Sequence, residues 1–304
     1  LLEQIKQWKP DCIVADSMAL WGKLIAKKLN IPFVSSTTTF AFNKDSAKVM
    51  KGSLRDFFKV ILQMIKAKRH IKRLQKNGYD IKSVFDIIQN DNNTNTIVYT
   101  SSMFQPYSET FSDKYVFVGP SIRPKCDIFE KTREKLVYIS MGTVNNNMTN
   151  LYKNCIDAFI NSDYQVVLSV GSQVDINELE EYVIKSDSRA QFHLLSYVDQ
   201  IAVLEKADVF LTHCGMNSVS ESLYFKVPLV MYPQTNEQKG VAFRVNELEA
   251  GLYLSGDSIS EIQIILKELL QQSKYKERAT AISNSFSKCG GSQRAVEKIL
   301  DVCF

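Results

Sequence analysis

Residues 207–238 read ADVFLTHCGMNSVSESLYFKVPLVMYPQTNEQ, and this stretch decides the fold. Its apolar run, residues 209–211, predicts a short strand buried inside a parallel sheet. Residues 213–215 follow where that strand must end, and they supply a tight turn that contains a glycine. Apolar residues between positions 219 and 224 recur at the spacing of one helical face. The local prediction is therefore strand, turn and helix.

The turn has the properties of an anion-binding site. Asn217 and Ser218 are favourable N-cap residues, so the helix is expected to begin at this point. Free backbone N–H groups and the positive end of the helix dipole then meet at one place, where a phosphate or diphosphate fits. Glu221 lies one turn into the helix, from where its carboxylate can accept hydrogen bonds from sugar hydroxyls.

A second buried strand is expected at residues 227–232, and Pro233 ends it. Glu237 and Gln238 follow in the next loop, at the same carboxyl edge of the sheet. Because open α/β folds bind ligands outside the carboxyl ends of their strands, these two side chains join the turn and Glu221 in one candidate site.

The segments THCGMNSVSES, VPLVMYPQ and NEQ resemble the donor-binding signature of UDP-sugar-dependent glycosyltransferases with the two-Rossmann-domain (GT-B) fold. The bacterial macrolide-glycosyltransferase-like branch is the most similar. The signature begins upstream at residues 197–200 (YVDQ), so it covers about forty residues at fixed spacing. The alternative is an ordinary Rossmann strand–turn–helix in which His213 is only structural.

The resemblance implies a role for each residue of a nucleotide-sugar site. Tyr197 would stack under the uracil ring and Val198 would meet the uracil edge through its backbone. Gln200 would reach the ribose, and Glu221 would hold the ribose hydroxyls. His213 would donate a hydrogen bond to a phosphate. The implied site comprises Gly142, Thr143, Tyr197, Val198, Gln200, His213, Gly215, Met216, Asn217, Ser218, Glu221, Glu237 and Gln238.

Within this set, Gly142 and Thr143 would approach the diphosphate, and Glu237 and Gln238 would hold hydroxyls of the transferred sugar. The sequence departs from the family pattern at three positions. Tyr197 stands where Trp is usual, which weakens stacking. Asp199 replaces a usual Pro, which leaves the geometry of its loop open. Lys226 replaces a frequent Gly and is expected to be a surface substitution.

The resemblance also implies an inverting transfer of a hexose, by default glucose, from a UDP-sugar to a hydroxyl of a small hydrophobic acceptor. In such enzymes a histidine is the general base and an aspartate orients it. The segment PDCIVADSMA resembles the one that ends in this aspartate, which assigns Asp16 to catalysis. The alternative is that Asp16 caps the following helix.

No metal and no cofactor besides the UDP-sugar are expected, because helix N-termini and neutral donors can stabilise the leaving diphosphate. The three histidines are His70, His193 and His213, and none lies in the sequence context of the general base. The chain begins with Leu, inside what resembles the later part of an N-terminal domain. It therefore resembles a protein whose first roughly ninety residues are not included, by analogy with the family fold.

The expected fold class is α/β, with two Rossmann-like domains whose parallel sheets face a cleft. Residues 1–120 would form an incomplete acceptor-binding domain, 121–133 a linker, and 134–304 a nucleotide-sugar domain whose final helix can cross back. A turn followed by a buried strand is expected at 10–15, and further strands are expected at 31–35, 97–100, 115–118, 136–140, 165–170 and 191–195. Helices are expected at 19–29, 149–160, 240–250, 261–271 and 275–287, followed by a last helix that Ser292 caps and that ends at Cys303.

Composition indicates an ordinary globular protein. The 304 residues are 45% hydrophobic and 23% charged, and no apolar run has the length of a membrane span. The net charge of +4 is too small to indicate a nucleic-acid partner. The six cysteines show neither CxxC pairs nor metal-ligand spacing, which favours reduced thiols and a cytoplasmic location.

Charge is concentrated in one segment. Residues 44–82 contain twelve Lys or Arg against three Asp. Within this segment apolar residues recur at helical spacing, so residues 48–76 are expected to form an amphipathic helix with a basic face. The face is either simply solvated or makes a peripheral contact with a membrane or an anionic acceptor.

Two other functions stay open. The chain could be a catalytically silent fragment that binds a UDP-sugar or a partner, which the missing general base favours. It could also resemble a GT-B epimerase that acts on UDP-GlcNAc, although the pattern from Tyr197 to Gln238 fits transferases better. The sequence does not predict the oligomeric state.

Overall fold

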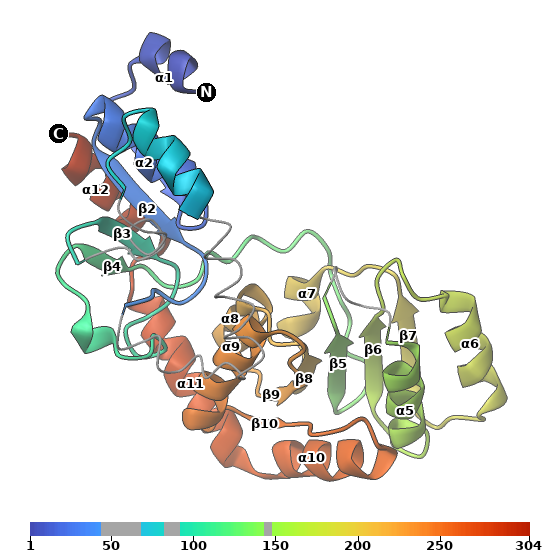
Figure 1. Cartoon of the computed structure of the whole chain (residues 1–304). Coiled ribbons are helices and arrows are strands. Elements are labelled where there is room, and N and C mark those ends of the chain that lie inside the picture. Colours follow the sequence, from blue (N-terminus) through green and yellow to red (C-terminus); the bar gives the residue numbers. More distant parts are fainter. Residues whose placement is uncertain (44–67, 82–91, 143–147) are drawn as a thin grey trace. The chain divides into compact units, whose positions relative to one another are not determined.

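A computed structural model of the chain describes residues 1–43, 68–81, 92–142 and 148–304 (Figure 1). These residues form two compact units. The first unit combines Leu1–Ser121 with Ser285–Phe304, and the second is Ile122–Asn284. Each unit is built on a parallel sheet of its own.

The first unit is organised around a four-stranded sheet in the order β1-β2-β3-β4, with every pairing parallel. Its strands are β1 (Ile13–Asp16), β2 (Phe33–Thr37), β3 (Asn95–Val98) and β4 (Tyr115–Phe117). Its helices include α1 (Leu2–Trp8), α2 (Leu20–Leu29), the short 3-10 helix η2 (Ser108–Thr110) and α12 (Gly291–Cys303). Because parallel strands need a long crossover, α2 connects β1 to β2, as the order of elements predicts.

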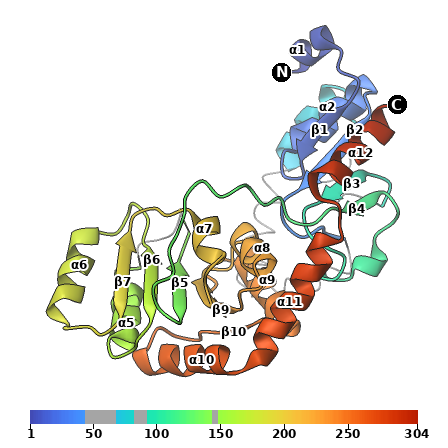
Figure 2. The same cartoon turned by 180° about the vertical axis from the view of Figure 1, so that it is seen from behind.

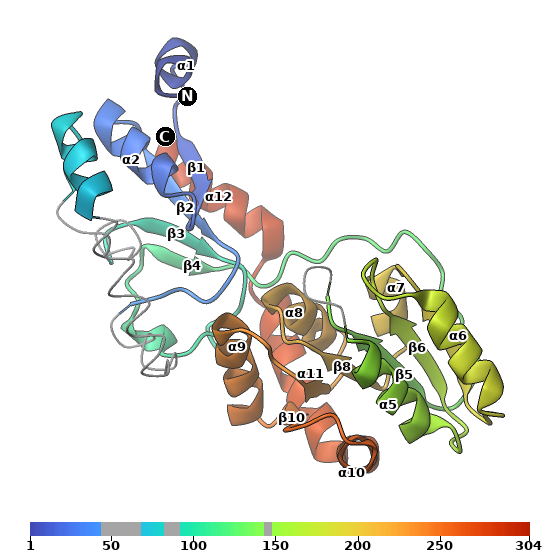
Figure 3. The same ribbon diagram turned by 45° about the vertical axis from the view of Figure 1, so that its right-hand side comes forward.

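Opposite faces of this sheet carry different helices (Figures 2 and 3). On one face, Phe33 packs with Ile25 of α2. On the other face, Val34 and Ile97 pack against Ala295 of α12. Successive residues of a strand point to opposite sides of a sheet, which explains why Phe33 and Val34 belong to different clusters. The C-terminal helix therefore covers strands from the N-terminal part of the chain.

The basic segment 48–76 lies partly outside the described residues, which leave out 44–67. Residues 68–76 form a helix whose exposed side chains include the basic residues Lys68, Arg69, Lys72, Arg73 and Lys76. Just beyond this helix, Asp80 pairs with Lys27 of α2 (Oδ2–Nζ 2.7 Å), and the Asn77 carbonyl accepts from Lys28 (2.5 Å). The described part of the segment is thus attached next to α2, with its charges in solvent.

The second unit contains a six-stranded parallel sheet in the order β10-β9-β8-β5-β6-β7. Its strands are β5 (Leu136–Ser140), β6 (Gln165–Ser169), β7 (Gln191–Leu195), β8 (Val209–Thr212), β9 (Leu229–Met231) and β10 (Gly251–Tyr253). Counted from β5, the strands run 3-2-1-4-5-6 across the sheet, which is the Rossmann order. The chain changes direction across the sheet between β5 and β8, so the switch point lies there.

Helices connect these strands and cover both faces of the sheet (Figure 1). They are α5 (Thr149–Phe159), α6 (Ile176–Lys185), α7 (Gln200–Leu204), α8 (Met216–Tyr224), α9 (Asn236–Glu247), α10 (Ile259–Gln271) and α11 (Ser273–Ser287). The final residues of α11, from Ser285 onward, belong to the first unit.

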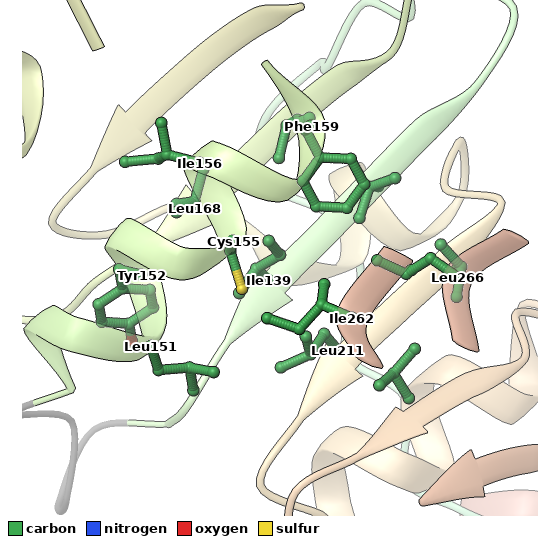
Figure 4. Packing of buried hydrophobic residues seen from close by; sticks show 14 of the residues in the cluster. Ile139, Leu151, Tyr152, Cys155, Ile156, Phe159, Leu168, Leu211, Ile262 and Leu266 are labelled. Carbon is green, nitrogen blue, oxygen red and sulfur yellow. The ribbon is translucent and has the colours of Figure 1, made fainter. Parts of the chain in front are cut away.

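The main core of the second unit fills the space between α5, α10 and the central strands (Figure 4). Leu151, Cys155 and Ile156 of α5 form this cluster with Ile139 of β5 and Ile262 of α10, and Cys155 lies beside Ile139. These side chains are at most 2% exposed. Each fully buried Leu or Ile contributes roughly 1.5–3 kcal/mol, so this cluster holds the sheet rigid beneath the loops at its carboxyl edge.

The opposite face of the sheet supports α7. Tyr138 of β5 stacks on Phe210 of β8, with ring centroids 4.6 Å apart and planes inclined by 16°. The Tyr138 hydroxyl lies 3.3 Å from Oε1 of Gln200 and donates to it. A buried tyrosine usually finds such a partner, and here the partner is the first residue of α7.

Residues 122–133, which we call the strap, fall within the segment expected as a linker, yet they contact the second unit. Lys131 Nζ lies 2.6 Å from Oδ2 of Asp208. The Thr132 N–H donates to Oε1 of Gln165 (2.8 Å), a fully buried side chain. Buried polar groups of the second unit therefore depend on the strap for hydrogen bonds.

Helix α9 begins at Asn236, so Glu237 and Gln238 lie in its first turn, whereas the sequence predicts a loop there. Two predicted N-caps are also wrong. Helix α8 begins at Met216 with Gly215 as its N-cap, so Asn217 and Ser218 lie inside the first turn and do not cap it. Helix α12 begins at Gly291 with Gly290 as its N-cap, so Ser292 does not cap it either. In both helices a glycine without a side chain occupies the cap position, and no side chain closes the first turn.

Candidate functional site

The carboxyl ends of β5, β8 and β9 meet at the switch point of the second sheet. Strand β8 pairs with β5 on one side and with β9 on the other. The residues that follow these strands are Gly142, His213 and Pro233, so three separate loops start at one edge. This is the edge where open α/β sheets bind ligands.

The imidazole of His213 fills a slot between two glycines. A Cβ atom added to Gly142 would lie 2.6 Å from Cε1 of His213, and one added to Gly215 would lie 2.7 Å from Nε2. Both distances are shorter than real contacts allow, and Gly142 also has a φ of +78°. Glycine at these two positions is therefore what allows the ring to lie between the two turns.

The turn that leads into α8 is strained. Cys214 adopts a φ of 65°, which is uncommon for a residue with a side chain. Its N–H is 3.4 Å from the hydroxyl oxygen of Thr212, and its thiol is 3.6 Å from the Thr212 carbonyl. The turn delivers the chain to Gly215, after which the N–H groups of Met216, Asn217 and Ser218 form the uncapped first turn of α8. Such groups bind anions.

His213 is half-buried, and burial lowers the pKa of its imidazole below the ordinary value. A hydrogen bond between the ring and the Ser140 backbone acts in the opposite direction on this pKa. Burial is the larger effect, so the ring is neutral at neutral pH and carries one N–H.

Glu221 belongs to a chain of hydrogen-bonded side chains. Nε2 of Gln200 donates to Oε2 of Glu221 and lies 3.5 Å from the hydroxyl oxygen of Ser218. Oε1 of Gln200 in turn accepts from Tyr138. The Gln200 amide is thus oriented at both ends, and it fixes the Glu221 carboxylate on α8.

Burial raises the pKa of Glu221 above its ordinary value. The hydrogen bond from Gln200 and the charge of Arg123 lower this pKa, whereas the charge of Asp199 raises it. The carboxylate is therefore influenced by two opposed charges in a partly dehydrated site, which is typical of groups that bind a ligand.

The segment before α7 presents one side chain outward and one inward. Tyr197 is 72% exposed, whereas Asp199 is buried. Burial by itself raises the pKa of Asp199, but hydrogen bonds from Arg123 and from the N–H groups of Cys126 and Asp127 hold it at about 2. Val198 is half-buried between them.

The loop before α9 is held by a capping box. Oε1 of Gln238 accepts from the N–H groups of Gln234 (2.8 Å) and Thr235 (3.0 Å), and the Gln238 N–H donates to Oγ1 of Thr235 (3.3 Å). Glu237 is exposed. One oxygen of Gln238 is thus used for the fold, and its Nε2 is the atom left to meet a ligand.

Two other predicted site residues are described separately from this group. Thr143 falls outside the described residues. Asp16 ends β1 in the first unit, where Oδ1 accepts from the Met18 N–H (2.8 Å) and Oδ2 lies 3.4 Å from the Thr38 hydroxyl oxygen. The N-cap of α2 is Ala19, so Asp16 does not cap that helix. The alternative prediction, that Asp16 caps the following helix, is therefore wrong.

Three structural residues of the site were not predicted. Arg123 lies in the expected linker, Tyr138 has the pattern of any buried strand residue, and Asp199 differs from the family pattern only by replacing a usual Pro. Asp199 accepts from the Ile201 N–H (3.2 Å) as the N-cap of α7, and an Asp just before an apolar run is the signal that could have revealed this helix.

Within the described ranges, no group of three or more His, Cys, Asp or Glu is placed to hold a metal ion.

Among the helices that the structure describes, none is both long and apolar enough to cross a membrane.

Comparison with protein families identifies the class. Residues 126–288 match the family model described as UDP-glucoronosyl and UDP-glucosyl transferase. The uncharacterized UDP-glucosyltransferase YojK of Bacillus subtilis is 34% identical over 318 residues, covering 99% of this chain and 75% of that protein. The NDP-glycosyltransferase YjiC of the same organism is 33% identical over 305 residues, covering 98% and 74%.

Solved structures have the same fold. CalG4, the calicheamicin glycosyltransferase, superposes with a TM-score of 0.81 at 25% identity, covering 99% of this chain and 75% of that chain. The glycotransferase of kitacinnamycin gives a TM-score of 0.85 at 24% identity, covering 99% and 79%. The chain belongs to the UDP-glucoronosyl and UDP-glucosyl transferase family, and its fold class is GT-B, as the sequence predicts. It is a UDP-dependent glycosyltransferase.

Proposed function

We propose that this glycosyltransferase moves a hexose, by default glucose, from a UDP-sugar to a hydroxyl of a small hydrophobic acceptor, with inversion at the anomeric carbon. The observation that carries the donor half is the His213 slot beside the uncapped N-terminus of α8. A diphosphate placed there would meet oriented N–H groups and a helix dipole. The names of the relatives YojK and YjiC support a nucleotide-sugar donor.

In this proposal, binding of the diphosphate raises the pKa of His213, so that its imidazole takes up a proton. The ring is neutral when the site is empty, because burial lowers its pKa. Two negative phosphate groups would offset that effect, so both ring nitrogens could donate, one toward Ser140 and one toward the ligand. Gly142 and Gly215 allow a close approach, because a Cβ at either position would collide with the ring.

The nucleoside would lie along the start of α7. Tyr197, which is exposed, would stack on the uracil ring, and the Val198 backbone would meet the uracil edge. Glu221, oriented by Gln200, would accept from the ribose hydroxyls. Glu237 and Nε2 of Gln238 would contact the hexose hydroxyls.

For the transfer step, the acceptor oxygen attacks the anomeric carbon while the bond from that carbon to the β-phosphate oxygen breaks. The electron pair leaves with UDP, and the acceptor proton passes to a general base. We assign Asp16 as the carboxylate that orients the base, since only Met18 and Thr38 contact its two oxygens among the described residues. The first unit would serve the acceptor. The test of this half is release of UDP from UDP-glucose with a panel of phenolic, macrolide and sterol acceptors.

Titration calorimetry of the whole chain with UDP tests the donor site. We expect His213→Ala to weaken UDP binding by about 1–3 kcal/mol, the usual scale for a hydrogen bond to a charged group. The parent should bind UDP more tightly as the pH falls from about 8 to about 6.5, because binding takes up a proton, and His213→Ala should lose this dependence. His193→Ala, which changes a histidine on β7, is the matched control and should bind like the parent. A folded parent that gives no heat with millimolar UDP would remove the proposed function.

A further inference from the structure

Asp199 connects the strap to the start of α7. Its Oδ1 lies 2.5 Å from Nη2 of Arg123 and also accepts from Ile201 within α7. Its Oδ2 accepts from the N–H groups of Cys126 (2.6 Å) and Asp127 (3.1 Å). The carboxylate is only 2% exposed, so its charge is compensated by these partners rather than by water.

The position of this carboxylate determines the position of its neighbours. Helix α7 has only five residues, and four of them are buried, so its orientation is set by packing and by its N-cap. Asp199 is that N-cap. Tyr197 lies two residues before it, and Gln200 is the next residue. Gln200 donates a hydrogen bond to Glu221. A shift of Asp199 would therefore displace Tyr197, which would stack on the uracil ring, and also Gln200 and Glu221, which would hold the ribose.

We propose that Asp199 and Arg123 are a positioning pair for the nucleoside part of the donor site. By tying the strap to the N-cap of α7, the pair holds Tyr197 and Gln200, and through Gln200 the Glu221 carboxylate, in the arrangement that a ribonucleoside diphosphate requires. The inference rests on the proposed function, because it concerns the same nucleotide.

Electrostatics supports the same assignment. The Arg123 charge lowers the pKa of Glu221 and the Asp199 charge raises it, so both members of the pair are near enough to influence that carboxylate. Arg123 is 41% exposed while Asp199 is buried, which places the guanidinium at the boundary between the strap and the site. A guanidinium is suited to this position, since its planar fork can pair with a carboxylate and remain partly hydrated.

The experiment compares UDP with 2′-deoxyuridine diphosphate in calorimetric titrations of the full chain. The variants are Asp199→Asn, Arg123→Ala and Arg123→Lys. Lys125→Ala is the matched control, because Lys125 belongs to the strap and pairs with Glu205 at the other end of α7 (2.6 Å). Thermal melting of each variant reports its folding. Should Asp199→Asn fail to fold, the two Arg123 variants still test the proposal, since the Arg123 side chain is partly exposed.

We expect the parent to prefer UDP over the deoxy ligand, because Glu221 would hold ribose hydroxyls. Asp199→Asn and Arg123→Ala should weaken UDP binding about tenfold and abolish this preference, whereas Lys125→Ala should change neither. Arg123→Lys, which keeps the charge, should recover part of the preference. A loss that is equal for both ligands would reduce the pair to a structural role, and unchanged titrations would overturn the proposal. If the parent binds no UDP, the proposed function itself fails, which is a different result from a parent that binds while its variants are indistinguishable from it.

Discussion

Glu221 shows how a single residue can be poorly suited to folding and well suited to binding. Burial raises its pKa, and the hydrogen bond from Gln200 only partly offsets that effect. Since the folded-state pKa lies above the ordinary value of 4.5, the contribution of this group to stability is present below pH 4.5 and is lost as the pH rises through the folded pKa. At neutral pH the charge therefore opposes folding.

Replacing Glu221 with Gln should stabilise the empty protein and weaken its binding of UDP. The amide keeps an oxygen that accepts from Gln200 but removes the buried charge. We expect the melting temperature at pH 7 to rise by about 1–3 °C, with the difference disappearing near pH 4. Differential scanning calorimetry at the two pH values measures this. Glu205→Gln is the control, because Lys125 lowers the pKa of Glu205, and removing its charge should not stabilise the protein. A lower melting temperature for Glu221→Gln at pH 7 would contradict the conclusion that the Glu221 charge opposes folding.

The sequence predicted the residues at strand ends better than the residues that support them. His213, Gly215 and Glu221 lie in one short motif, and the structure brings them together with Gly142 at one edge. Their roles toward a ligand stay predictions. Asp199 and Arg123 are 76 residues apart in sequence, and no local pattern reports a contact of that kind. Because Asp199 replaces a usual Pro, the sequence left the geometry of its loop open. In the structure Asp199 is the buried N-cap of α7.

Lys226 is a similar case at the surface. It replaces a frequent Gly and was expected to be a surface substitution, and its side chain is exposed. Its backbone, however, has a φ of 63°, in the left-handed region where glycine is favoured. The turn between α8 and β9 therefore keeps the conformation that suits glycine even with a lysine in place.

Among the elements, several strands and helices matched their predictions, and three elements were missed. Strands β5 and β7 have the expected limits, and α5 differs from its expected range at one end only. Helix α6, the short helix α7 and the edge strand β10 were not predicted. The three residues of β10 depend on pairing with β9 and on close packing at Gly251, which are tertiary effects that sequence periodicity does not report.

The helix at residues 68–76 allows a test of the two interpretations of the basic segment. Its basic side chains are exposed, which fits a solvated face and equally a contact with anionic lipid. If the face binds membranes, the chain should sediment with vesicles that contain about 30% anionic lipid at low salt and should dissociate in high salt. Reversal of Lys68, Arg69 and Lys72 to Glu should then abolish sedimentation.

The control for this experiment is a triple reversal of the same net charge elsewhere. Lys267 of α10, Lys276 of α11 and Lys288 just after α11 are exposed and suit this purpose. Equal loss of sedimentation in both triple variants would indicate a general charge effect. If the parent stays in the supernatant at low salt, the membrane interpretation is wrong and the basic face is simply solvated.

For the whole molecule, the arrangement of the chain is discontinuous: Ile122–Asn284 is inserted between two parts of the first unit. The sequence predicted the α/β class and the strand content because buried parallel strands are nearly continuous apolar runs. The sequence predicted that the final helix can cross back but not that it packs on β2 and β3, since an apolar helix face does not show which sheet it covers. Ala295 is one residue at that contact, where it meets Val34 and Ile97.

Ala295→Asp should destabilise the first unit and leave UDP binding in the second unit intact. The substitution would place an unpaired carboxylate against Val34 and Ile97, at a cost of about 3 kcal/mol or more. Calorimetric melting should show an earlier transition, while a UDP titration at low temperature should match the parent. The control is Val296→Asp at the neighbouring position, which is 53% exposed and should melt like the parent. Equal loss of stability in both variants would show that α12 is not seated as described.

The position of α12 also fixes the order in which the protein can be completed on the ribosome. Strands β1 to β4 leave the exit tunnel before the helix that covers Val34 and Ile97, which is translated after the whole of Ile122–Asn284. The second unit is continuous in sequence and can acquire its core while translation is still in progress. The nascent first unit, in contrast, carries an uncovered apolar sheet face during that time. A nascent chain stalled before residue 291 should therefore be the form of this protein that chaperones engage.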